Sequence, residues 1–182
     1  MATEISADAI HDPVHGAAYT FRRDGDDLWV TAWLEDGGHL PEHLHPTLDE
    51  RWEVLDGTVR LRLDGTWRDV TAADGPMRVA PGVRHALGNT SGSRAHLRCR
   101  VSPAGDLQEF LTESAAAARA GMLSKGGLPT SLAAAGWVAR FALRFRHETI
   151  MCSPPPALQR IALPLLARIG RDAPEGATPR TA

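Results

Sequence analysis

Three histidines and one glutamate have the residue types and the spacing of a metal site. His43 and His45 are separated by one residue, Glu50 lies five residues after His45, and His85 follows forty residues after His45. Imidazole nitrogens and carboxylate oxygens are ligands that first-row divalent metals accept. The four residues therefore predict a metal centre, provided that the surrounding elements bring them together.

Strand geometry explains this spacing. Residues i and i+2 of a strand point to the same face, about 7 Å apart along the backbone, so His43 and His45 can reach one metal ion. The odd offset from His45 would put Glu50 on the opposite face of a straight strand. Pro46 predicts a bend between them, so that Glu50 opens the next strand and shares its inward face with Trp52. We expect His85 to come from a partner strand.

Short alternating segments fill the first hundred residues. In residues 28–34, Leu28, Val30, Ala32 and Leu34 alternate with larger or polar residues, which is the period of a strand. Further strands are predicted at 51–55, 58–63, 67–70, 77–79, 85–89 and 95–101. Asp-Gly and Pro-Gly pairs separate most of them. Many short strands joined by such turns indicate an antiparallel sandwich or barrel.

The pattern changes to a helical one after Pro103. Helices are predicted at 107–122, 131–147 and 157–169, the last kinked at Pro164. We therefore divide the chain into an N-terminal arm (1–14), a β-barrel (15–103), a helical C-terminal extension (104–170) and a disordered tail (171–182). The 182 residues fit one principal domain.

The histidine-rich segment resembles the first motif of the cupin superfamily, G-x5-H-x-H-x4-E-x6-G. The residues that match it are Gly37, His43, His45, Glu50 and Gly57. The second cupin motif is matched at Gly82, His85 and Asn89. Ala80 stands where that motif has proline, with Pro81 next to it, and Gly75 lies one position closer than the motif's first glycine. The resemblance covers residues 15–103.

This resemblance implies a mainly β fold: a cupin-like antiparallel jelly-roll β-barrel, followed here by two or three C-terminal α-helices. It implies one divalent transition metal inside the barrel, which is iron, manganese, nickel, zinc or copper in different cupins. The ligands that it implies are His43, His45, Glu50 and His85. Glu50 is also the candidate catalytic residue, as a ligand that can act as a base.

Four protein ligands on a metal that accepts five or six leave positions for a substrate or dioxygen. We therefore expect a metal-dependent enzyme that acts on a small organic molecule, and we favour an oxygenase or dioxygenase. Two alternatives stay open. One is a non-redox cyclase, isomerase or lyase of the cupin type. The other is a non-catalytic cupin that binds a small molecule, which would keep its affinity if a metal ligand were removed.

Four further residues are candidates for the substrate pocket. Trp52 is the strongest, because it shares the face of Glu50, and Trp33 is a second tryptophan on a predicted strand. His39 lies just before the first motif, and Arg78 could bind a carboxylate. Each has a plainer alternative: core packing for the tryptophans, a loop position for His39 and a solvent-facing strand position for Arg78.

Composition and charge indicate which classes of partner to expect. The net charge is −2, which gives no reason to expect nucleic acid. Two distant cysteines and an N-terminus without an apolar run favour a cytoplasmic protein. Residues 119–171 hold eight lysine and arginine residues against Glu148 alone. We expect the apolar face of the helices to pack on the barrel or form a homodimer; the alternative is peripheral membrane contact by residues 131–169.

Overall fold

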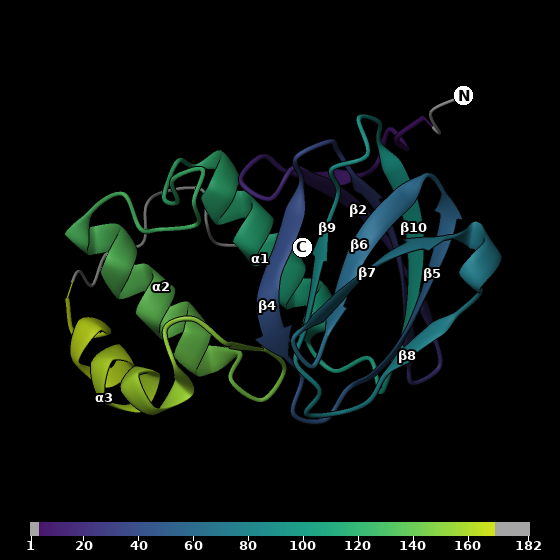
Figure 1. Ribbon diagram of the computed structural model, residues 1–182. Coiled ribbons are helices and arrows are strands. Elements are labelled where there is room, and N and C mark those ends of the chain that lie inside the picture. Colours follow the sequence, from purple (N-terminus) through teal and green to yellow (C-terminus); the bar gives the residue numbers. More distant parts are fainter. Residues whose placement is uncertain (1–3, 170–182) are drawn as a thin grey trace.

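The structure is a computed structural model of the chain, and it describes residues 4–169. Two antiparallel sheets face each other and form a barrel, and three helices lie beyond β4, on the opposite side of the barrel from β7 and β8 (Figure 1). This confirms the predicted fold class. Among the described residues, no helix is long and apolar enough to cross a membrane.

The larger sheet has six strands in the order β1-β2-β3-β10-β5-β8. The strand bounds are β1 Ile10–Asp12, β2 Ala17–Asp24, β3 Asp27–Leu34, β5 Asp49–Asp56, β8 Met77–Val79 and β10 Ala95–Ser102. β10 is central and pairs with β3 on one side and β5 on the other. Glu50 therefore enters the barrel from this sheet.

The smaller sheet has five strands in the order β11-β4-β9-β6-β7. Their bounds are β4 His39–Leu44, β6 Thr58–Leu63, β7 Thr66–Thr71, β9 His85–Gly88 and β11 Ile150–Met151. A single 3-10 turn, Ala72–Asp74, joins β7 to β8. The three candidate histidines all belong to this sheet or directly follow one of its strands.

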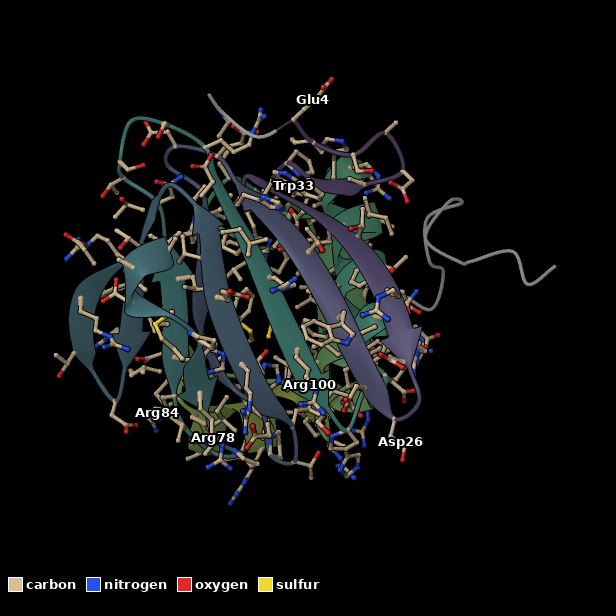
Figure 2. The ribbon with its side chains drawn as sticks, turned by 90° about the vertical axis from the view of Figure 1, so that its right-hand side faces the viewer. Glu4, Asp26, Trp33, Arg78, Arg84 and Arg100 are labelled. Atoms are coloured by element: carbon tan, nitrogen blue, oxygen red, sulfur yellow. The ribbon has the colours of Figure 1, made fainter. Side chains whose placement is uncertain are left out.

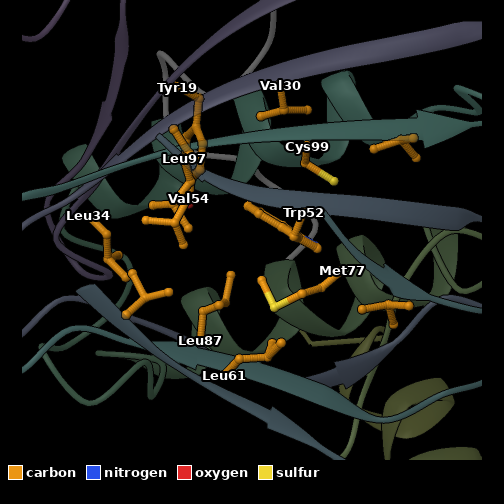
Figure 3. Packing of buried hydrophobic residues seen from close by; sticks show 14 of the residues in the cluster. Tyr19, Val30, Leu34, Trp52, Val54, Leu61, Met77, Leu87, Leu97 and Cys99 are labelled. Carbon is orange, nitrogen blue, oxygen red and sulfur yellow. The ribbon is translucent and has the colours of Figure 1, made fainter. Parts of the chain in front are cut away.

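Alternation along the strands builds the core between the two sheets. Leu28, Val30 and Leu34 are almost fully buried, as their period of two predicts. Val54 and Trp52 from the larger sheet face Leu61 and Leu87 from the smaller one (Figure 3). Removal of these apolar side chains from water is the principal stabilising term of such a barrel.

Gly57 shows why a motif glycine stands at the turn between β5 and β6. Its φ is 84°, in the left-handed region that side chains rarely adopt. A Cβ at this position would also lie 3.1 Å from the Cα of Ala95 in the neighbouring strand β10. The turn therefore requires glycine for both its conformation and its packing.

The helices form two packing units. α1 (Leu107–Arg119) places Leu107 in the barrel core, with Phe110 and Leu111 packed against it. α2 (Leu132–Arg144) and α3 (Pro156–Leu166) pack on each other. Phe110 contacts Phe141 and Phe145, with ring centroids 5.0 and 5.6 Å apart, which joins the two units.

Two details differ from the predicted arrangement. Residues 10–12 of the expected loose arm form β1, because the Asp12 carboxylate accepts the amides of Val14 and His15 and turns the chain back onto β2. The two-residue strand β11, inside the helical extension, was not predicted at all. The predicted disorder of 171–182 lies outside the described residues.

Candidate metal centre

His43, His45 and His85 converge on one point. One ligand nitrogen from each ring lies within 4.8 Å of the other two. The reason is register: His43 at the end of β4 pairs directly with His85, the first residue of β9. His45, two residues after His43, turns to the same face. The chain thus contains a three-histidine group of the kind that holds a metal ion.

Glu50 approaches the same group from the opposite sheet. Its Oε1 lies 3.3 Å from His45 Nε2, and its Oε2 lies 3.0 Å from His85 Nε2. The bend predicted at Pro46 is present, since β4 ends at Leu44 and β5 begins at Asp49. The carboxylate is therefore a fourth ligand candidate, lying against two of the three imidazoles.

Backbone carbonyls fix the orientation of all three rings. The Nδ1 atoms of His43, His45 and His85 lie 2.7, 2.6 and 3.1 Å from the carbonyl oxygens of Pro41, Glu148 and Val83. A carbonyl oxygen only accepts, so each Nδ1 must carry the proton and donate it. Every neutral ring then presents its Nε2 lone pair, which is the arrangement that metal-binding histidines show.

This arrangement leaves an electrostatic conflict that a cation would resolve. With Nδ1 protonated, the Nε2 lone pairs of His45 and His85 face an ionised carboxylate, and all of these atoms are acceptors. His85 Nε2 is buried and has no hydrogen-bond partner. A metal ion bound by the same nitrogens and oxygens removes the repulsion, and in the metal-free protein a proton on His45 does so. The residues present fit a divalent metal.

Burial and the neighbouring charged groups together set the pKa of each of these residues. Burial, together with the neighbouring imidazoles, lowers the pKa of His43 to about 3, so this ring is neutral. Burial would also lower the pKa of His45, but the Glu50 carboxylate outweighs it and raises that pKa. For Glu50, burial favours the neutral acid, yet the two histidines hold its pKa well below the usual value. Glu50 is therefore ionised.

The centre is deeply enclosed. His85, Glu50 and His45 are only 1, 2 and 3 % exposed, whereas His43 is half-buried. His43 is thus the most exposed of the four candidate ligands. Its strand, β4, is flanked by β9 and by the short strand β11.

Trp52 holds the carboxylate from inside the barrel. Its indole Nε1 donates to Glu50 Oε2 over 3.1 Å, and the side chain is buried. Of the four predicted pocket residues, it is the one that the structure places beside the candidate ligands.

The other three predicted pocket residues lie elsewhere. Trp33 is on the outer face of the larger sheet, stacked on His96 with ring centroids 5.0 Å apart, because it alternates with the inward-facing Ala32 and Leu34 (Figure 2). Arg78 points outward on β8, where its Nε donates to Asp49 Oδ2 over 2.7 Å. His39 packs edge-on against His15 and is not in the three-histidine group. The structure does not bring these three residues to the three-histidine group, and their part in a substrate pocket stays a prediction.

A further contributor, the segment 145–152, could not be recognised from the sequence. Its Glu148 carbonyl anchors His45, and the Thr149 hydroxyl lies 3.3 Å from the same Nδ1. β11 then pairs with β4 opposite His43. A backbone carbonyl contributes through its position and not through its side chain, so no residue pattern could have revealed it. The helical extension therefore helps to build the centre.

The second motif supports the centre through its backbone. The amide of Gly82 donates to the carbonyl of His45 over 2.8 Å, which ties the Pro-Gly turn to the first motif. Asn89 is completely buried, and its amide nitrogen donates to the carbonyls of Leu34 and Ser93. The departure at Ala80 leaves this turn intact, and His85 is correctly placed.

No protein-family model matches the chain, and no curated protein sequence matches it. Among solved structures it is similar to KdgF from Halomonas sp. (18 % identity, 56 % of this chain and 92 % of that one, TM-score 0.49). It is also similar to an RmlC-like cupin from Shewanella frigidimarina (21 % identity, 58 % and 93 %, TM-score 0.49). A third similar structure is oxalate oxidase in complex with glycolate (18 % identity, 57 % and 56 %, TM-score 0.45).

Similarities at this level carry no information about substrate or reaction. The resemblance depends on the molecule itself: two facing antiparallel sheets, and motif histidines that meet at one point with a glutamate beside them. In its fold and in its motif residues, this chain is similar to the cupin superfamily.

Proposed function

We propose that this chain is a metal-dependent enzyme that acts on a small organic molecule, with oxygenase-type chemistry favoured. One observation carries the proposal. Three imidazoles, each with its Nδ1 proton held by a carbonyl, present Nε2 lone pairs toward one point beside an ionised, buried carboxylate. Such a donor set is suited to iron, manganese, nickel, zinc or copper.

His43, His45 and His85 would hold the metal, with Glu50 as the fourth ligand. When bound, the metal would supply Lewis-acid or oxygen-activating chemistry at the coordination positions that four ligands leave open. The protein's own contribution is orientation. The three carbonyl partners fix the rings, and the Trp52 indole fixes the carboxylate.

Glu50 is the candidate for moving a proton. It is ionised, and its Oε1 faces His45 while its Oε2 accepts from Trp52. A carboxylate that leaves its ligand position would meet a proton of a bound substrate in a site that excludes water. The enclosure at the centre favours a substrate of a few heavy atoms that enters beside His43.

A second candidate is a non-catalytic small-molecule-binding cupin. The observation that favours it is the near-complete burial of Glu50, His45 and His85, which limits access to the centre. Non-redox cyclase, isomerase or lyase chemistry remains the alternative within the enzyme class, because the donor set also suits zinc.

One experiment separates these candidates. Metal-free protein is loaded in turn with Fe²⁺, Mn²⁺, Ni²⁺, Zn²⁺ and Cu²⁺ and offered a panel of small carboxylates, hydroxy acids and phenols. Oxygen uptake with product formation supports the oxygenase, turnover without oxygen uptake supports non-redox chemistry, and a ligand-induced spectral change without turnover supports a binding protein. His43→Ala should abolish turnover, whereas His39→Ala on the same strand should retain it. The enzyme proposal fails if no metal supports turnover.

A further inference from the structure

The outermost helix, α3, has an exposed face of unusual composition. Along α3 and the turn that follows it, the exposed side chains between residues 157 and 169 are apolar or arginine: Ala157, Leu158, Arg160, Ile161, Pro164, Leu165, Arg168 and Ile169. Ile161, Leu165 and Leu158 are 68, 57 and 53 % exposed. A soluble surface helix normally exposes polar side chains, so this face indicates a partner.

The orientation of the face is fixed by contacts on its other side. Arg140 of α2 donates to the carbonyl oxygens of Ala167 and Ile169, and so holds the end of α3. Gly136 lies against the Ile169 carbonyl, where any Cβ would collide, so the two helices approach closely. Gln159 donates to the carbonyls of Met151 and Pro154 at the other end. The apolar residues are therefore presented outward by a fixed helix, at the edge of the molecule (Figure 1).

Two occupants of this face are disfavoured by the sequence. The segment 170–182, GRDAPEGATPRTA, has no large apolar residue with which to cover the patch. A second copy in a two-fold contact would set the patch against itself. The segment 149–169 has no acidic residue, so the contact would bring Arg160 and Arg168 of both copies together without compensation. Neither arginine makes an ion pair with a described residue.

We propose that α3 docks this protein on an anionic membrane surface, with Leu158, Ile161 and Leu165 in the interface and Arg160 and Arg168 facing lipid phosphates. Apolar residues flanked by arginine, without acidic residues, are the composition of helices that lie in the plane of a membrane. The helix is too short to span the bilayer. This proposal is independent of the chemistry at the metal centre.

The test measures co-sedimentation of the full chain with vesicles of phosphatidylglycerol and phosphatidylcholine, and with vesicles of phosphatidylcholine alone. We expect binding to the anionic vesicles at low salt that weakens as salt is added, and at least about tenfold weaker binding to phosphatidylcholine. Ile161→Ser combined with Leu165→Ser should reduce the partition coefficient at least about tenfold. Arg160→Gln and Arg168→Gln should each reduce it about fivefold.

A matched control is Trp67→Ser, which removes another exposed apolar side chain, on β7 of the barrel. It should leave the partition coefficient unchanged. All substituted positions are exposed, so the variants should keep the circular dichroism spectrum of the parent. The proposal is overturned if the parent does not bind anionic vesicles at low salt, or if the α3 variants bind as the parent does. It is also overturned if sedimentation shows a dimer that the Ile161→Ser, Leu165→Ser variant converts to monomers, since a second copy then covers the face.

Discussion

At the scale of single residues, the positions of the ring protons determine which nitrogen atoms the candidate metal centre presents to an ion. The same sequence offset serves two of the three rings: His43 donates to the carbonyl of Pro41 and His85 to that of Val83, each two residues earlier. These two rings are therefore oriented locally, by the strands to which they belong. His45 depends instead on Glu148, which is distant in the sequence.

Trp52 should act on the metal through Glu50. Trp52→Phe keeps an aromatic ring in the core but removes the N–H that donates to Glu50 Oε2. We expect metal affinity to fall about tenfold. Loss of a hydrogen bond to a metal ligand typically lowers affinity about 10- to 100-fold, and this estimate takes the lower value. Isothermal titration of the metal-free protein measures it. Trp33→Phe is the matched control, because the Trp33 indole N–H has no hydrogen-bond partner and lies on the other face. Equal losses in both variants would contradict this role.

Metal binding should displace a proton from His45. Glu50 raises the pKa of His45 in the metal-free protein despite its burial, so the ring keeps its proton above the ordinary value of about 6.5. A metal ligand must be neutral. Affinity should therefore increase from about pH 6 to about pH 8, as the competing proton is lost. The stabilisation that the charged ring gives the metal-free fold is full below its unfolded pKa, and it disappears as pH rises through the folded pKa.

Calorimetric titration in two buffers of different ionisation enthalpy reports the released proton. Glu50→Gln is the control, because it removes the charge that raises the pKa and should reduce proton release near pH 7. The same binding enthalpy in both buffers for the parent protein would show that His45 is already neutral.

At the scale of elements, the C-terminal extension contributes to the candidate metal centre. The segment after α2 carries the Glu148 carbonyl to His45 and then pairs as β11 with β4, beside His43. A chain that ends at residue 147 loses both contacts, and we expect metal affinity to fall about 10- to 100-fold. A chain that ends at residue 153 loses α3 but keeps both contacts, and should bind metal as the full chain does.

The Nδ1 proton of His45, which the Glu148 carbonyl accepts, can be observed by NMR. Its resonance distinguishes loss of this hydrogen bond from a general loss of stability. Its proton resonance should be present in the chain ending at 153 and absent in the chain ending at 147. If both truncated chains keep the resonance and the full affinity, the extension has no part in orienting His45.

The elements differ in how far the sequence predicts them. Strands with four or more alternating residues, such as β3, β5 and β10, were predicted because one face is buried and the other is not. β1 and β11 have three and two residues and show no period. Each of them forms at the edge of a sheet, where the folded chain places a short segment beside an exposed strand. This placement depends on the assembled fold and not on the residue pattern of the segment.

At the scale of the whole molecule, the two sheets bring together residues that are separate in sequence. The motif spacing predicted that His43, His45, Glu50 and His85 would meet, and the structure places them together. The spacing could not show on which face Trp33, Arg78 and His39 lie, because the face of a strand residue depends on register and on what covers the sheet. The chain thus combines a barrel that encloses a donor set with a helical extension that reaches back to it.

The most direct test of this account is the metal content of the full chain purified without added metal. Elemental analysis should find about one first-row transition metal ion per chain, since one three-histidine group is present among the described residues. His85→Ala should lose the metal, whereas His39→Ala should retain it, and both should keep the β-rich circular dichroism of the parent. A parent protein that contains no metal and binds none of the five candidate ions when they are added would contradict the account.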